Sequence, residues 1–262
     1  MTEFVRYECV DAIATVTIDR PAALNALDNA TKVALRNALT RAAGDANVRA
    51  VVLTGAGRAF CVGQDLRQHR EQLARSAQTA FATVAEHYNP LVMALTTMRK
   101  PVIAAVNGVA AGAGAALAFA CDFRILAETA TLNLAFAGIG LAADSGASWT
   151  LPRLVGHARA TELLMLPETI SASRALELGL ANRMVPAEDI AVAANDLARR
   201  LATGPTVAFA AIKEALACSA TLPISRALGK ESALQLRVGK SADHREAVDA
   251  FLNKTQPRFT GR

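Results

Sequence analysis

The sequence predicts an α/β fold in which a spiral of strand-strand-helix units is followed by a helical C-terminal region. The pattern of two strands and a helix recurs near residues 10–43, 48–75 and 101–120. Such recurrence is typical of chains that stack similar units on one another. After Pro152 the apolar spacing becomes helical. The chain has 262 residues, of which 52% are hydrophobic, and this suffices for a large core. We expect a core over residues 1–195 and a helical region over residues 196–262.

The first unit begins with a strand over residues 13–18, where Ile and Val alternate with Thr. A loop at residues 19–27 leads to a helix that starts near Asp28, because Asp is a common N-cap. The helix runs to about Ala43, since Gly44 follows and glycine commonly ends a helix. The second unit begins with a buried strand over residues 49–54. Two glycines stop this strand, and the loop that they open enters another helix.

Residues 102–121 form a run of 20 residues without a charge, which is long enough to span a membrane. Pro101 precedes a β-branched stretch, however, and Asn107-Gly108 then forms a turn signal before a second, small-residue segment. The run is rich in Ala rather than Leu, and no belt of aromatic residues marks its two ends. We therefore expect a strand, a turn and a helix here, and no membrane association.

The rest of the chain predicts a short strand near residues 123–126 and then mostly loop, with short extended pieces, up to Trp149. Six helices are expected near residues 157–166, 172–178, 188–203, 205–218, 222–238 and 243–253. The apolar positions of the last helices fit two arrangements equally well. These helices either fold back on the spiral or pack against a neighbouring subunit.

Composition limits the class of protein. The four cysteines are scattered without CxxC spacing and the N-terminus lacks the features of a secretory signal, so we expect reduced thiols and a cytoplasmic location. Residues 199–262 hold 11 Lys or Arg and 5 Asp or Glu, while the whole chain has a net charge of +5. This basic bias is interleaved with Ala and Leu at helical spacing, as on a solvated face. Aromatic residues make up only 5% of the chain, so nucleic acid is not an expected partner.

Asp144 is the candidate catalytic residue. It closes an apolar run that starts at Gly138, and burial among apolar groups raises the pKa of a carboxyl group toward the range useful for proton transfer. The following residues, Ser145 to Pro152, also fit a second interpretation in which Asp144 is a helix N-cap. In that case the helix dipole would lower its pKa.

Two glycine-containing loops supply candidate hydrogen-bond donors. The first, at residues 55–66, leaves a strand and enters a helix, and the second, at residues 107–116, places glycines on both sides of Ala113. Free N–H groups at helix starts bind oxygen atoms well. The N–H groups of Val62 and Ala113 are thus predicted to stabilise an oxyanion together. Each loop, taken alone, equally fits simple tight packing.

Several other kinds of site are not expected. The chain has no GxGxxG after a strand and no GK[ST], so NAD and ATP are not predicted cofactors. A serine nucleophile would need a GxSxG turn, which is missing. No metal site is predicted, because the four histidines form no ligand pair with Cys or a carboxylate; they are His69, His87, His157 and His244.

Four stretches taken together resemble one family. They are Arg20-Pro21 with LNAL at residues 24–27, GRAFCVGQDL at residues 57–66, the run from PVIAAVNG at residues 101–108 to Cys121-Asp122, and residues 175–185 with GLAN. In this order they are specific to the enoyl-CoA hydratase/isomerase or crotonase superfamily. The resemblance covers essentially the whole chain. It implies a spiral of ββα units, a C-terminal trimerisation region, a homotrimer or hexamer, and acyl-CoA thioester substrates, with coenzyme A as part of the substrate and no separate cofactor.

The same resemblance implies roles for individual residues. It places the oxyanion hole on the N–H groups of Val62 and Ala113, and Lys254 or Arg258 near the CoA phosphates. The implied substrate contacts are Ala22, Ala23, Leu24 and Ala26 around CoA, and Gly63, Gln64, Asp65, Leu66 and Gly112 beside the thioester.

The departures from the family pattern bear on the reaction. Hydratases of this family carry two catalytic glutamates, and this chain has Ala116 and Phe136 in their places. Asp144 resembles the carboxylate of the 1,2-epoxyphenylacetyl-CoA isomerase-like branch, while aryl-CoA dehalogenases use an aspartate near this point as a nucleophile. One carboxylate suffices for a proton shift. We expect an isomerase with an apolar acyl pocket formed by Phe136, Ile139, Leu141 and Trp149, with a hydratase and a non-catalytic CoA-thioester-binding protein as the alternatives.

Overall fold

A computed structural model describes residues 4–262 and contains ten strands, which lie in two sheets. The larger sheet has six strands in the order β1-β2-β3-β5-β7-β10, and the smaller has four in the order β4-β6-β8-β9. The strands of the larger sheet are β1 (Val5–Val10), β2 (Ile13–Ile18), β3 (Ala50–Gly55), β5 (Val102–Val106), β7 (Phe123–Ala127) and β10 (Arg183–Val185). Those of the smaller sheet are β4 (Ala59–Cys61), β6 (Val109–Ala111), β8 (Thr131–Asn133) and β9 (Ile170–Ser171).

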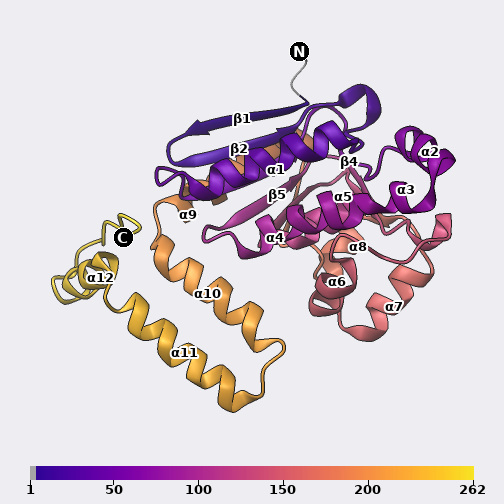
Figure 1. Cartoon of the computed structure of the whole chain (residues 1–262). Helices are drawn as coiled ribbons and strands as arrows, with labels where there is room; N and C mark the ends of the chain where they lie inside the picture. The colour runs from indigo at the N-terminus through magenta and orange to yellow at the C-terminus, as the bar shows by residue number, and fades with distance from the viewer. Residues whose placement is uncertain (1–3) are drawn as a thin grey trace.

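The alternation of strands between the sheets makes the spiral. Each turn gives one strand to the larger sheet and the next to the smaller sheet, as β3 then β4, β5 then β6, and β7 then β8. From β2 to β10 the larger sheet is parallel, and β1 joins it as an antiparallel edge strand. Parallel neighbours need crossovers, which here are supplied by helices. The expected α/β spiral is confirmed, and Figure 1 shows its helices packed beside the larger sheet.

Helices follow the strands of the first turns. They are α1 (Asn29–Gly44), α2 (Leu66–Arg75), α3 (Ala77–Thr83), the π-helix η2 (Val84–Tyr88), α4 (Asn89–Thr97) and α5 (Ala113–Ala120). Asp28 caps α1 by accepting a hydrogen bond from the Thr31 N–H, as its position in the sequence predicts. The segment that contains α3, η2 and α4 was not predicted.

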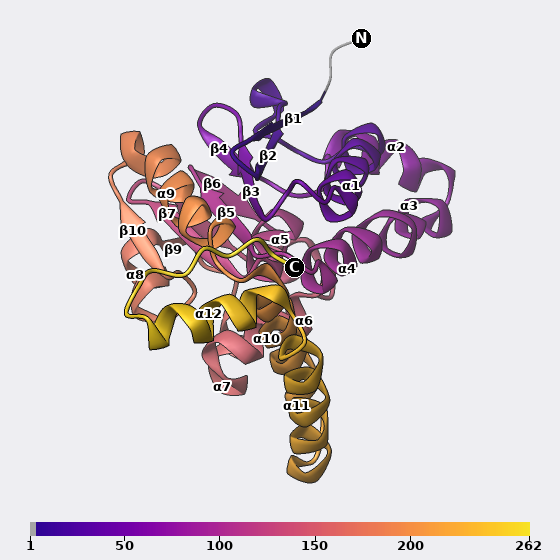
Figure 2. The ribbon, with the colours of Figure 1, turned by 90° about the vertical axis from the view of Figure 1, so that its left-hand side faces the viewer.

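The second half of the chain is largely helical. Its helices are α6 (Ala147–Val155), α7 (His157–Met165), α8 (Ala172–Glu177), α9 (Ile190–Ala202), α10 (Thr206–Ser219), α11 (Ile224–Val238) and α12 (Ala242–Leu252). Helix α9 packs on β3, β5 and β7. The expected boundary between residues 195 and 196 therefore falls inside a helix of the core, and the chain leaves the sheet only after Gly204-Pro205. Figures 1 and 2 show α10 and α11 extending away from the sheets as an arm.

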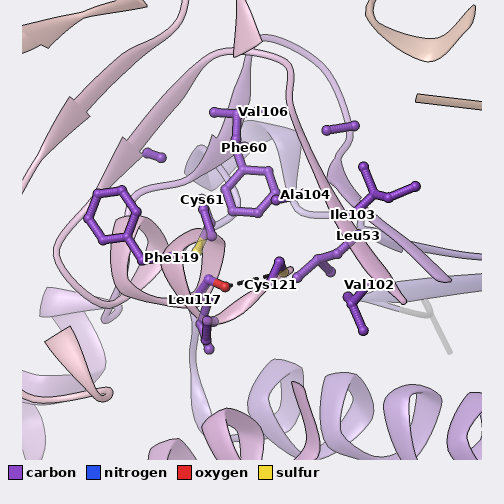
Figure 3. Packing of buried hydrophobic residues seen from close by; sticks show 14 of the residues in the cluster. Leu53, Phe60, Cys61, Val102, Ile103, Ala104, Val106, Leu117, Phe119 and Cys121 are labelled. Carbon is purple, nitrogen blue, oxygen red and sulfur yellow. Dashed lines mark hydrogen bonds between the residues drawn. The ribbon is translucent and has the colours of Figure 1, made fainter. Parts of the chain in front are cut away.

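The core lies around β5 and α5. Every residue of β5 and of α5 is buried, and Figure 3 shows Phe60 from β4 near Val106 and Ala104 of β5. Strand β5 can be apolar on both faces because helices and the smaller sheet cover it. The uncharged run at residues 102–121 is thus divided into β5, β6 and α5.

No single helix within residues 4–262 is long and apolar enough to cross a membrane; only α9 and α10 with their flanking residues, bent by 103°, pass that test as a pair by length and composition.

Candidate active site

Asp144 lies in the loop between the 3₁₀ helix η3 (Ala137–Ile139) and α6. The residue that caps α6 is Gly146, and no side chain caps this helix. Ser145 and Gly146 both have positive φ angles, 51° and 74°, which delays the start of the helix beyond the reach of the Asp144 carboxylate. The N-cap interpretation of Asp144 is therefore wrong. Its carboxylate instead accepts one hydrogen bond, from the Ser145 hydroxyl to Oδ1 at 2.8 Å.

The surroundings of Asp144 suit a general base. Burial raises its pKa, while the Ser145 hydroxyl and the positive charge of Lys32 oppose that rise. A carboxylate with a raised pKa holds a proton more readily and so exchanges it more easily with carbon acids near neutral pH.

A cavity of about 130 Å³ joins Asp144 to both glycine-containing loops. Predicted residues on its wall are Val62, Gln64, Leu66, Gly112, Ala113, Phe136, Ile139, Leu141 and Asp144. Residues that the sequence reasoning did not predict are His69, Phe81, Thr83, Val84, Tyr88, Ala111 and Ala135. Among residues 4–262, Asp144 is the only carboxylate on this wall.

The two candidate oxyanion donors differ in their hydrogen bonding. The N–H of Ala113 opens α5, and within the described residues it donates to no protein acceptor. The N–H of Val62 donates to the Leu24 carbonyl over a long 3.3 Å. A thioester oxygen would thus have to displace the Leu24 carbonyl from the Val62 N–H, whereas the Ala113 N–H would be free to bind it.

Glycines bring the two loops together. A Cβ on Gly63 would lie 2.8 Å from the Ala111 carbonyl oxygen and 3.1 Å from the Ala113 nitrogen, and one on Gly114 would lie 2.0 Å from the Cys61 oxygen. The glycines at 63 and 114 therefore make room for the neighbouring loop. Gly112 is different, because a Cβ there would meet nothing within 4 Å, and its φ of 50° is what favours glycine.

The predicted CoA loop lies beside this cavity but not on its wall. Ala22 and Ala23 belong to the 3₁₀ helix η1 (Pro21–Ala23), and Leu24 has a left-handed φ of 51°. Leu24 reaches the site through its carbonyl at Val62. Ala26 is buried behind the loop, where its own carbonyl accepts a hydrogen bond from Arg20.

Asp65 has a structural role. Its Oδ1 accepts hydrogen bonds from the N–H groups of Arg67 and Gln68 at the start of α2, and its Oδ2 pairs with Arg20 at 3.2 Å. It does not line the cavity. Lys254 follows α12 in the C-terminal region and does not line the cavity either.

Trp149 lies outside the Asp144 cavity. Because α6 begins at Ala147 and buries Ala147, Thr150 and Leu151, Trp149 faces the opposite side of this helix. There it stacks under the Arg153 guanidinium, 4.0 Å from the ring, and lines a separate apolar cavity of about 750 Å³ beside α10. The expectation that Trp149 shapes the acyl pocket is not met, whereas Phe136 and Ile139 do line it.

A buried polar cluster next to the cavity was missed. Lys32 on α1 is fully buried, and its Nζ donates to Gln64 and Thr83, both of which lie on the cavity wall. The sequence analysis assigned no role to Lys32. The signal that could have revealed Lys32 is its spacing of three and seven residues from Leu35 and Leu39, which places it on the buried face of α1.

Metal chemistry has no obvious site. Within residues 4–262, no group of three or more His, Cys, Asp or Glu side chains could hold a metal ion.

Comparison with known proteins relates the whole chain to one family. A family model described as enoyl-CoA hydratase/isomerase matches residues 8–262. The chain is 45% identical over 258 residues to a probable enoyl-CoA hydratase of Rhodobacter capsulatus, with 98% of each covered. It is 42% identical to the 1,2-epoxyphenylacetyl-CoA isomerase of Escherichia coli over 262 residues, with 100% of each covered.

Solved structures agree. A structure from Mycobacterium abscessus, provisionally assigned as an enoyl-CoA hydratase/isomerase, superposes with a TM-score of 0.95 at 47% identity, covering 98% of this chain and 100% of that chain. The enoyl-CoA hydratase of Bacillus anthracis superposes with a TM-score of 0.92 at 31% identity, covering 99% of this chain and 100% of that chain. The spiral described above is therefore the fold of these proteins.

Proposed function

The chain belongs to the enoyl-CoA hydratase/isomerase family, and we propose that within it the protein is an acyl-CoA isomerase in which Asp144 carries the proton. One observation carries this proposal. Asp144 is the only carboxylate on the cavity wall within residues 4–262, and it shares that wall with Val62 and Ala113. The two positions at which family hydratases carry glutamates hold Ala116, buried in α5, and Phe136.

The proposed reaction is a proton shift along the acyl group. Asp144 takes a proton from one carbon, and the electron pair moves into the thioester to give a dienolate. The thioester oxygen then accepts hydrogen bonds from the Val62 and Ala113 N–H groups, which lowers the energy of the developing charge. The protonated Asp144 returns the proton two carbons away, so no water is consumed and the carboxylate is regenerated.

The proposed substrate is an acyl-CoA thioester with an apolar acyl group. Phe136, Ile139 and Leu141 supply the apolar wall next to Asp144. The similarity to the Escherichia coli enzyme, whose name specifies 1,2-epoxyphenylacetyl-CoA, makes ring-derived acyl groups good candidates. The thioester is itself the group acted on, so the proposed reaction needs no separate cofactor.

A homotrimer, or a hexamer made of two trimers, is the proposed assembly. The arm formed by α10 and α11 stands away from the sheets (Figure 2). In the single chain this arm exposes large apolar side chains. They include Ile212, Leu216, Ile224, Leu228 and Leu236, each more than half exposed in the single chain. Apolar surface of this kind is typical of subunit interfaces.

Hydration is the second candidate, because the relative from Rhodobacter capsulatus is named a probable enoyl-CoA hydratase. The test uses 3-enoyl-CoA, 2-enoyl-CoA and a phenylacetyl-derived epoxide CoA thioester in deuterated water, each with the wild-type protein and with Asp144→Asn. Isomerisation predicts a shifted double bond without added water. Deuterium enters carbon to the extent that the proton on Asp144 exchanges with solvent before it is returned, and Asp144→Asn should lower the rate of the shift by about 10² to 10⁴-fold. Equal amounts of hydroxyacyl product from both proteins would refute the proposal. Tight CoA-thioester binding without turnover would instead identify a non-catalytic binding protein.

A further inference from the structure

The cluster around Lys32 has a geometry that the proposed proton shift does not use. Lys32 Nζ donates to Gln64 Oε1 at 3.0 Å and to Thr83 Oγ1 at 2.5 Å, and it lies 5.0 Å from the centre of the Tyr88 ring. Within residues 4–262, no carboxylate forms an ion pair with this buried ammonium. Burying a lysine without such a partner costs stability. The presence of Lys32 at this position therefore calls for a functional explanation.

The cluster fixes the orientation of one side-chain amide. An ammonium group can only donate hydrogen bonds, so the atom of Gln64 that faces Lys32 must be its oxygen. The Tyr88 hydroxyl donates to the same oxygen at 2.7 Å. Both acceptor positions of that oxygen are thus occupied, and rotating the amide by 180° would place its NH₂ group against the Lys32 ammonium, which can only donate.

The amide nitrogen of Gln64 is left as a donor with little to bind. Its one protein contact within the described residues is the Asp65 carbonyl at 3.5 Å, which is at the limit for a hydrogen bond. Gln64 lies on the cavity wall together with Val62, Ala113 and Asp144. Most of the other side chains on this wall are apolar, and those that carry acceptor atoms, including Asp144, Thr83 and His69, form no hydrogen bond with the Gln64 nitrogen within the described residues.

We infer that Gln64, held in place by Lys32 and Tyr88, is a specificity-determining donor that selects acyl groups carrying an oxygen acceptor, such as an ether, an epoxide or a ring ketone, over plain hydrocarbon chains. Lys32 and Tyr88 act as positioning residues. A polar group in a mostly apolar cavity discriminates strongly, because a ligand without the matching atom leaves that group unpaired. The inference deepens the proposed function, since it names the class of acyl group for the same cavity.

The charge of Lys32 also bears on Asp144. Burial lowers the pKa of Lys32 to about 8, and the carboxylates of Asp28, Asp144 and Asp65 oppose that change. A positive charge behind Gln64 polarises the amide and strengthens the donor at its other end. The same charge favours the ionised form of Asp144.

The test is a binding measurement that needs no turnover, so its failure is separate from failure of the isomerase proposal. Cyclohexylacetyl-CoA is compared with the three oxanylacetyl-CoA isomers, in which one ring CH₂ is replaced by oxygen at position 2, 3 or 4. Isothermal titration calorimetry gives the affinity of each for the wild-type protein and for Gln64→Leu, Lys32→Met and Tyr88→Phe. Gln68→Leu is the matched control, because Gln68 also accepts a hydrogen bond, from the Asn29 N–H, but does not line the cavity.

In the wild-type protein one oxanyl isomer should bind about 10-fold more tightly than the cyclohexyl compound, the size of effect expected for one buried hydrogen bond. Gln64→Leu should abolish or reverse this preference, Lys32→Met and Tyr88→Phe should reduce it, and Gln68→Leu should leave it unchanged. The inference is overturned if the wild-type protein binds cyclohexylacetyl-CoA as tightly as every oxanyl isomer, or if Gln64→Leu keeps the preference. The first result requires no variant to fold.

Discussion

The Ser145 hydroxyl donates a hydrogen bond to Oδ1 of Asp144 at 2.8 Å, and this is the one hydrogen bond that the carboxylate accepts within the described chain. The bond favours the ionised form and therefore opposes the rise in pKa that burial causes. Lys32, from α1, opposes that rise too. Burial thus raises the pKa of the proposed base, and two groups lower it: the neutral Ser145 hydroxyl and the buried Lys32 cation.

Removal of the Ser145 hydroxyl is expected to raise the pKa of Asp144 further. The active form of the base is the carboxylate, so the acidic limb of the pH–rate profile should move to higher pH, with activity lost at acidic pH and kept on the plateau. Ser145→Gly is the better variant and Ser145→Ala its comparison, because the φ of 51° at this position suits glycine. A limb that stays in place or moves to lower pH in Ser145→Gly would contradict the role of this hydrogen bond.

Asp144→Asn should separate activity from stability. Turnover is expected to fall by about 10² to 10⁴-fold, as for loss of a general base, while CoA-thioester affinity changes little. Because burial raises the folded pKa of Asp144, its stability contribution is fully present below the unfolded pKa and lost as pH rises through the folded pKa.

Asn has no charge to bury, so the variant should be more stable than the wild type at pH 7. This advantage should shrink as the pH falls through the raised pKa of Asp144, and it should be gone below the ordinary pKa of aspartate. Urea unfolding at several pH values measures the difference. A variant less stable than the wild type at neutral pH, with an unchanged fold, would argue against a destabilised native carboxylate.

The contact between the two glycine-containing loops gives a third prediction. Gly114→Ala would place a Cβ 2.0 Å from the Cys61 carbonyl oxygen, so it should destabilise the protein by about 1–3 kcal/mol and separate the Val62 and Ala113 amides. Gly229→Ala on α11 is the control, because nothing lies within 4 Å of its Cβ position. That helical substitution should stabilise by about 0.5–1 kcal/mol. Thermal unfolding and turnover are measured for both variants. If Gly114→Ala and Gly229→Ala change stability and turnover equally, the contact between the two loops does not have the proposed importance.

The sequence predicted the long, regular elements well. Strand β2 matches its predicted range, residues 13–18, and the last helices agree within a few residues, because each carries a strong apolar period that tertiary packing does not override. Strands β4, β6 and β8 have three residues each, too few for an alternating pattern to be visible. The segment from α3 to α4 was missed, since a π-helix at Val84–Tyr88 interrupts its helical spacing.

The site was predicted in part for similar reasons. An apolar run ending in a carboxylate identified Asp144, but the left-handed residues after it displaced the helix start and removed the expected cap. Trp149 was misplaced because its direction depends on where that helix begins. Lys32 was missed because a lysine on an amphipathic helix is normally solvated, and only the folded structure brings Gln64, Thr83 and Tyr88 around it.

The arm formed by α10 and α11 gives the last prediction. Leu216 on α10 is 68% exposed and lines the apolar cavity beside Trp149, so in the proposed trimer this surface is covered by another subunit. Leu216→Lys would bury an unpaired charge there and should shift the assembly toward monomers. Met165→Lys is the control, because Met165 is 70% exposed at the end of α7 and lies off this cavity. Light scattering after size-exclusion chromatography gives the mass of each species, with circular dichroism to verify folding. A wild-type monomer, or a Leu216→Lys protein with the wild-type mass, would show that the arm does not hold the subunits together.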